Sequence, residues 1–245
     1  MNDRGNHGTC KLCLQERELR RSHIIPEFFY SQAYDDLHRL DLISADAPDK
    51  VRFHQKGVRE RLLCQECEQW LSPWEKHTRE VFYGGCEIEI VDTGSAITLR
   101  NLDYRKLKLF QLSMLWRMGI ADHQLFKEVT LGHHEDRLRS MVLRGEPGRA
   151  YDYGCFLLAL VDEKNRGIDG VIGQVEKKRD SGHHLYAVVV GSCWWVFVVS
   201  SHTEMLPFRE FFLQDDGTLT INRQLAWKNP FIAKLISGVR RAHLS

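Results

Sequence analysis

Four cysteines in two identically spaced pairs are the residues of this sequence with the clearest chemistry. Cys10 and Cys13 are separated by two residues, as are Cys64 and Cys67, and 50 residues lie between the pairs. Two thiolates at this spacing hold one side of a tetrahedral zinc ion, and a second pair closes the other side. Because four thiolates leave no open coordination position, the pattern predicts a structural zinc site. Chance pairing and a redox dithiol are the alternatives.

A histidine follows the first cysteine pair in the stretch "RRSHIIPEFFY", residues 20–30. A site of four cysteines needs no fifth ligand, so His23 is available for another purpose. Glu68 directly follows the last cysteine, where a helix is expected to begin. A carboxylate there can hold a hard cation such as Mg²⁺. The helix dipole alone also favours an acidic residue in a first turn.

Three segments, "CKLC", "SHIIP" and "LLCQECE", together resemble the zinc-containing HNH (ββα-metal) nucleases over residues 10–80. The resemblance implies a treble-clef zinc module in which His23 is the general base for phosphodiester hydrolysis. It also implies a catalytic Mg²⁺, or Mn²⁺ or Ni²⁺, with Glu68 as a ligand. The implied partner is nucleic acid, with DNA favoured over RNA, in a phage, mobile-element or defence setting.

The match to this family's catalytic residues is partial. Ser22 stands where the family has an acidic residue, and Glu68 stands where it has Asn or His. The family's intermediate Asn has no counterpart between Val51 and Leu63. Two other interpretations of His23 therefore stay open. In one, the module is catalytically degenerate and binds nucleic acid or another protein. In the other, His23 is structural and donates a hydrogen bond beneath the zinc site.

The overall charge excludes a polycationic nucleic-acid binder. The formal net charge is +1, with 27% charged and 43% hydrophobic residues. Any nucleic-acid surface must therefore be a local patch. Three basic clusters exist, and the first two flank His23 in the sequence. All three are ordinary solvated charges unless they gather in space. The clusters are Arg17, Arg20 and Arg21; Arg52, Lys56, Arg59 and Arg61; and Arg105, Lys106 and Lys108.

The chain has neither a run of eighteen apolar residues nor an apolar segment near its first residue. We therefore expect a cytoplasmic protein with no membrane partner. Reduced thiols in that compartment agree with zinc ligation. The remaining cysteines lie in apolar, strand-like contexts and are expected to be buried and inert; they are Cys86, Cys155 and Cys193. The oligomeric state is left open.

An N-terminal module of residues 1–83 must position these side chains. The sequence predicts a strand near His23–Ile25, a helix from Pro26 to about residue 40, and a loop with a short hairpin over residues 41–57. A strand then enters the second cysteine pair, and a helix follows that Pro73 bends or splits. Trp70 and Trp74 are expected to pack this module against the rest of the chain.

The pair "GG" at residues 84 and 85 predicts a boundary to a second domain, residues 84–245, and the whole chain is expected to be α+β. The pattern predicts a hairpin over residues 86–100 and a strong helix over 103–121, apolar on one face. A shorter helix ends at Gly145, strands cover 155–161, 185–191 and 193–200, and a helix lies near 230–240. The doublets "HH" at 133–134 and 183–184 are expected to be solvated loops and caps.

Overall fold

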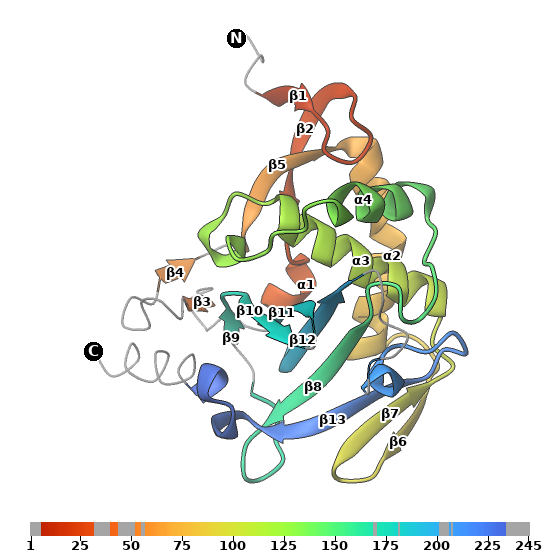
Figure 1. Ribbon diagram of the computed structural model, residues 1–245, viewed down its shortest axis with the longest axis vertical. Helices are drawn as coiled ribbons and strands as arrows, with labels where there is room; N and C mark the ends of the chain where they lie inside the picture. Colours follow the sequence, from red (N-terminus) through yellow and green to blue (C-terminus); the bar gives the residue numbers. More distant parts are fainter. Residues whose placement is uncertain are drawn as a thin grey trace.

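The computed structural model describes residues 6–31, 40–43, 52–54, 57–168, 171–180, 182–200, 206 and 208–233. Helices and strands are mixed along the chain without strict alternation, which confirms the predicted α+β class (Figure 1). None of the described helices is both long and apolar enough to cross a membrane.

A small antiparallel sheet forms the N-terminal end of the molecule, with strand order β1-β2-β5. Its strands are β1 His7–Thr9, β2 Glu16–His23 and β5 Arg59–Cys64. The strand predicted near His23–Ile25 is therefore misplaced, because β2 ends at His23. Helix α1, Glu27–Ser31, starts directly after Pro26. Residues 32–39, the remainder of the helix predicted there, lie outside the described residues.

Helix α2, Gln65–Tyr83, begins directly after Cys64 and runs through Pro73 as one helix. Of the two predicted outcomes, a bend or a split at Pro73, the split is therefore wrong. Proline removes one N–H donor and leaves the carbonyl of residue i−4 without its helical partner. That carbonyl belongs to the exposed residue Gln69, where water can donate the missing hydrogen bond.

A seven-stranded sheet forms the larger part of the molecule, in the order β10-β11-β12-β8-β13-β7-β6. Its strands are β6 Glu89–Asp92, β7 Ala96–Arg100, β8 Cys155–Val161, β10 Glu176–Asp180, β11 His183–Val190, β12 Cys193–Val199 and β13 Leu219–Leu225. The predicted hairpin and the three predicted strands are confirmed. Gly191 and Ser192 join β11 to β12 with φ values of 59° and 58°, as a two-residue type I′ turn requires.

A third sheet links the two parts of the chain. Strand β3, Leu40–Ile43, pairs antiparallel with β4, Arg52–His54, and parallel with β9, Val171–Gly173. The first pairing agrees with the predicted short hairpin. Short 3-10 helices lie at Gln124–Phe126, Arg209–Phe211 and Ala226–Lys228. Residues 230–233 are helical, and the rest of the helix predicted near 230–240 lies outside the described residues.

Helix α3, Tyr104–Ile120, contacts both α2 and α4, His134–Arg144 (Figure 1). We expected one apolar face on α3, but every residue from Leu107 to Met118 is buried. Its position between two helices and the sheet explains this difference, since no side of it faces solvent. The end of α4 is as predicted, because Gly145 adopts a left-handed φ of 64°.

One aromatic cluster joins the N-terminal elements to the large sheet. Trp195 of β12 is 0% exposed, and its ring centroid lies 5.8 Å from Phe29, 5.4 Å from Phe82 and 6.0 Å from Phe110. These four side chains come from α1, α2, α3 and β12. The residues on either side of the predicted boundary at Gly84 thus share one hydrophobic core.

Candidate functional site

The four predicted zinc ligands come together where β5 meets α2. The sulfur atoms of Cys10, Cys13, Cys64 and Cys67 all lie within 4.8 Å of one another, and those of Cys13 and Cys64 are 4.0 Å apart. Zinc–thiolate bonds of about 2.3 Å in a tetrahedron put sulfur atoms about 3.8 Å apart, so the cluster fits one zinc ion. Within the described ranges, no other group of three or more potential ligands is this compact.

Backbone hydrogen bonds hold the first cysteine pair in a tight turn. The Leu14 N–H donates to the Cys10 carbonyl at 2.8 Å, and Leu14 has a left-handed φ of 60°. The Cys64 N–H donates to Cys10 Sγ at 3.3 Å. A hydrogen bond from the Cys67 thiol, supported by backbone N–H groups, lowers the pKa of Cys10, whereas that same hydrogen bond together with burial raises the pKa of Cys67, and burial raises the pKa of Cys64. The thiolate is the form of cysteine that binds zinc.

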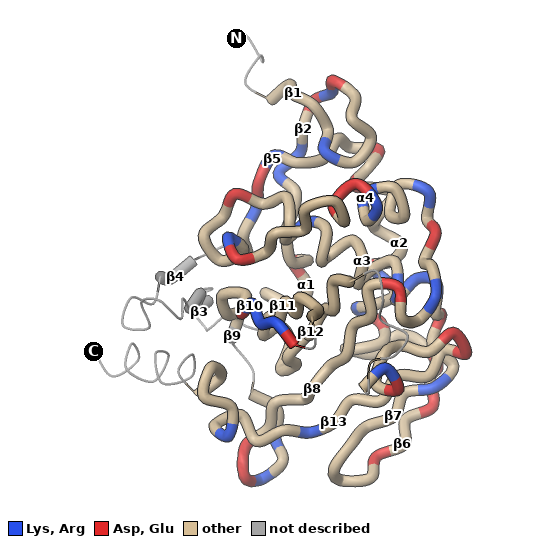
Figure 2. The backbone as a smooth tube through the Cα atoms, in the orientation of Figure 1, with Lys and Arg blue, Asp and Glu red and all other residues tan. Residues whose placement is uncertain are grey.

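One face of the ribbon formed by β2 and β5 carries His23 together with three arginines. The register pairs Arg21 with Arg61 and His23 with Arg59. Residues two apart on a strand project to the same side, so these four side chains share a face. We call Arg21, His23, Arg59 and Arg61 the arginine face. Figure 2 shows the basic positions along β2 and β5.

Nearby acidic side chains leave part of this positive charge unpaired. Glu18 pairs with Arg20 at 3.3 Å, and Glu60 accepts two backbone N–H groups from the segment after α3. In the part of the chain that the structure describes, neither Arg21 nor Arg61 forms an ion pair, and both are exposed; Arg61 Nη1 donates only to the Leu19 carbonyl, at 3.1 Å. Like charges directly opposite each other on antiparallel strands repel. An anion bound between them would relieve that repulsion.

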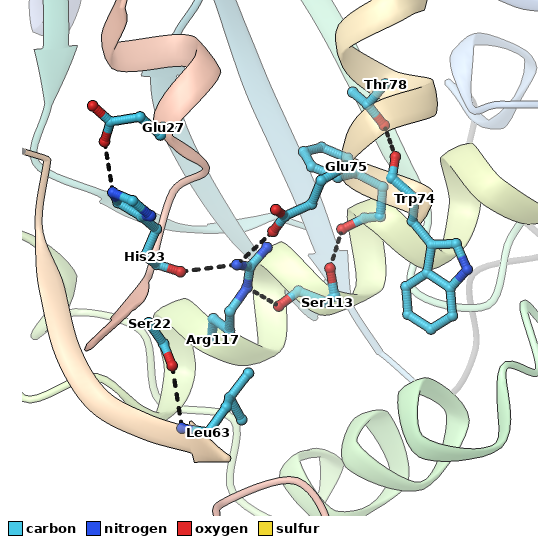
Figure 3. Close-up of polar contacts among 10 residues, drawn as sticks. Ser22, His23, Glu27, Leu63, Trp74, Glu75, Thr78, Ser113 and Arg117 are labelled. Atoms are coloured by element: carbon cyan, nitrogen blue, oxygen red, sulfur yellow. Dashed lines mark hydrogen bonds and ion pairs between the residues drawn. The ribbon is translucent and has the colours of Figure 1, made fainter. Parts of the chain in front are cut away.

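His23 is half-buried, and a carboxylate orients its ring. Its Nε2 atom lies 2.6 Å from Glu27 Oε2 (Figure 3). Arg59 Nη2 lies 3.3 Å from the same oxygen. Burial lowers the pKa of His23, and the charge of Arg59 acts in the same direction, while Glu27 opposes both. The Glu27 contact holds the imidazole in place, although His23 Nε2 has no hydrogen-bond partner of good geometry among the described residues.

Ser22 points away from the His23 ring and toward α2. Ser22 is 1% exposed, and its hydroxyl accepts the Leu63 N–H at 3.1 Å (Figure 3). Glu68, in the first turn of α2, lies beside this hydroxyl. Burial raises the pKa of Glu68, while Ser22 and the charge of Arg117 act against that rise. The structure therefore brings Glu68 next to Ser22, whereas the partner of the His23 imidazole is Glu27.

Sequence reasoning missed a buried arginine at the centre of this region. Arg117 of α3 is 1% exposed, and its Nη1 atom lies 2.8 Å from Glu75 Oε1 and donates to the His23 carbonyl at 2.8 Å (Figure 3). A charged residue within the apolar run "LSMLWRMGI" was the available signal, because arginines are rarely buried without partners. Glu27 and Glu75 were also missed, since acidic residues on helices are usually solvated.

A catalytic divalent cation does not fit the residues described here. The resemblance places its ligands at the positions of Ser22 and Glu68. Ser22 offers one hydroxyl that already accepts a hydrogen bond, and the Arg117 guanidinium repels a cation beside Glu68. Glu75 is already paired with Arg117. Hard cations take several oxygen ligands, which this set does not supply. The catalytic roles of His23 and Glu68 stay predictions.

The other candidate residues have structural partners. Trp70 donates its indole N–H to the Val142 carbonyl at 2.9 Å, so α2 packs on α4 as expected from the tryptophan pair. Cys155 and Cys193 are buried as predicted, while Cys86 is only half-buried. The rings of the first histidine doublet lie 3.9 Å apart at the start of α4, where a helix cap was expected.

No family model, no curated protein and no solved structure matches this chain. The resemblance to HNH nucleases therefore rests on the three quoted segments of the sequence.

Proposed function

We propose that this chain acts on nucleic acid through an HNH-like, treble-clef zinc module, and that the arginine face contacts the phosphodiester backbone. The observation that carries this proposal is the position of Arg21 and Arg61, which lie directly opposite each other, two residues from His23 and Arg59, with no ion-pair partner among the described residues. Guanidinium groups bind phosphate oxygens through charge-assisted, often bidentate hydrogen bonds. A backbone phosphate bound by both guanidinium groups would replace their mutual repulsion with two attractive contacts.

Zinc supplies structure in this proposal. When bound by Cys10, Cys13, Cys64 and Cys67, it would fix the turn before β2 to the start of α2. That link holds the arginine face at a constant geometry, which a binding surface needs. We place the protein in the cytoplasm, where the four thiols stay reduced and able to bind metal.

Replacing Arg21 with glutamine is expected to weaken binding to DNA of any sequence. Each phosphate contact adds about 0.9 to the slope of log K against log salt concentration, so the slope should fall by about one unit. Fluorescence anisotropy with a labelled duplex over a salt series measures this slope. The fold should not suffer, because the change also removes the Arg21–Arg61 repulsion.

Arg100→Gln is the matched control, because Arg100 is exposed on β7 and paired with Glu89 at 3.0 Å. Its salt slope should equal that of the unmodified chain. An unchanged slope in Arg21→Gln, or an equal fall in both variants, would remove the support for the arginine face.

Hydrolysis of the bound backbone is the second candidate function, and the Glu27–His23 contact favours it. A neutral, oriented imidazole can accept a proton from a water that attacks phosphorus. The alternative is that the module binds nucleic acid without cleaving it. A cleavage assay on the same protein preparation distinguishes binding with hydrolysis from binding alone.

His23→Ala is expected to abolish any cleavage while leaving binding within a few-fold of the unmodified chain. General-base catalysis typically contributes about 10²–10⁴-fold to a rate, so the loss should be clear. Supercoiled plasmid, single-stranded DNA and RNA would be incubated with zinc-loaded protein, with chelator or with Mg²⁺, Mn²⁺ or Ni²⁺. His77→Ala, at another half-buried histidine, is the control. Equal cleavage by His23→Ala would rule out His23 as the base.

A further inference from the structure

The residues around Glu68 do not form a binding site for a divalent cation, and Arg117 is the reason. Arg117 comes from α3, outside the segment that resembles the HNH nucleases. Its guanidinium is buried and bridges three elements: the His23 carbonyl of β2, Glu75 of α2 and, through Nε at 3.4 Å, the Ser113 carbonyl of its own helix (Figure 3). Contacts to three elements fix the position of this positive charge.

One carboxylate of α2, Glu75, contacts this arginine, and a second, Glu68, lies within reach of its charge. Glu68 and Glu75 are seven residues apart, which is about two helical turns, so they lie on one side of α2. Glu75 contacts Arg117 directly, and Glu68 is its electrostatic neighbour. Glu68 Oε1 and Arg117 Nη2 are both buried, and within the described residues neither has a direct hydrogen-bond partner.

We propose that Arg117 is a built-in cation that replaces the divalent metal at this HNH-like centre, so that the chain binds zinc at its four cysteines and no second metal ion. Buried carboxylates require a positive charge nearby. A divalent metal supplies that charge in a metal-dependent site, whereas here a side chain of α3 supplies it. The neutral Ser22 fits this arrangement, because a third acidic residue there would lack a counter-charge.

The test measures uptake of Mn²⁺ by zinc-loaded, full-length protein, with no nucleic acid present. Free Mn²⁺ has a strong paramagnetic resonance signal that is lost on binding. At millimolar Mn²⁺ the unmodified chain should keep its zinc and bind no Mn²⁺. Arg117→Met removes the charge and leaves Glu68 and Glu75 uncompensated, so its affinity for Mn²⁺ should rise by about tenfold or more. Adding Glu68→Gln to this variant should abolish the gain.

Arg139→Met is the matched control, because Arg139 of neighbouring α4 also donates to a backbone carbonyl, that of Leu12 at 3.0 Å, and should gain no Mn²⁺ affinity. Stoichiometric uptake by the unmodified chain, lost in Glu68→Gln, would overturn the proposal. So would a folded Arg117→Met chain that takes up no Mn²⁺. If Arg117→Met fails to fold, the unmodified chain decides alone: a melting temperature raised by Mg²⁺ overturns the proposal, and an unchanged one supports it. Because nucleic acid is absent, these results are independent of the proposed function.

Discussion

Replacing Cys13 with serine is expected to abolish zinc binding and to unfold the N-terminal sheet. Structural zinc contributes about 10–16 kcal/mol of apparent binding free energy in zinc-finger peptides, and that energy is folding energy. The strands β1, β2 and β5 have few buried residues, so we expect the turn around Leu12 to depend on the metal. Metal analysis of purified protein and circular dichroism melting curves measure the two effects.

Cys86→Ser is the control for this prediction, because Cys13 and Cys86 are both half-buried and only Cys13 belongs to the four-thiol cluster. The control should keep one zinc per chain and its melting temperature. A Cys13→Ser chain that retains stoichiometric zinc would show that the cluster is not the zinc site.

Truncation of Trp195 to alanine is expected to destabilise the whole chain, including the zinc module. Removing a fully buried aromatic side chain typically costs about 3–5 kcal/mol. For a chain of this size, a loss of that magnitude lowers the melting temperature by about 10 °C or more. Because Trp195 of β12 packs on Phe29 of α1 and Phe82 of α2, the N-terminal elements should melt together with the large sheet.

Trp227→Ala serves for comparison, since Trp227 is 39% exposed and its truncation should have little effect on stability. The melting of Trp195→Ala would be followed by circular dichroism and, separately, by release of zinc to a chromogenic chelator. Two transitions well separated in temperature, with zinc release unaffected by Trp195→Ala, would contradict the shared core.

Features set by a few neighbouring residues were predictable from the sequence. The spacing of Cys10, Cys13, Cys64 and Cys67 predicted their cluster, because each pair can hold one side of a metal ion without any knowledge of the fold. The cap at Gly145 was predictable for a similar reason. Glycine favours the left-handed conformation that this position adopts.

Features that depend on distant pairing were not predictable. Strand β13 pairs in parallel with β8, and β3 pairs in parallel with β9, although about 60 and 130 residues of chain separate them. No local pattern specifies such partners, because parallel strands are joined by long crossovers. Helix α3 was predicted as a helix, but the burial of all its sides follows from neighbours that the sequence does not identify.

In the candidate site, too, the residues beside a local motif were predictable and those brought in from distant parts of the chain were not. His23 and Glu68 were found because they lie beside recognisable motifs. Arg117 is 94 residues from the His23 carbonyl that accepts its hydrogen bond, and Glu75 looks like any other helical acid. The alternation of β2 and β5 also matters here. Arg21, Arg59 and Arg61 formed part of two separate clusters in the sequence, and only the register places them on one face with His23.

Hydrogen–deuterium exchange with and without a saturating DNA duplex tests the central claim, that the arginine face contacts nucleic acid, most directly. The account predicts that DNA slows exchange in peptides covering β2 and β5, residues 16–23 and 59–64, more than elsewhere in the chain. Protection confined to other segments, or no protection in a chain that is demonstrably saturated with DNA, would contradict it.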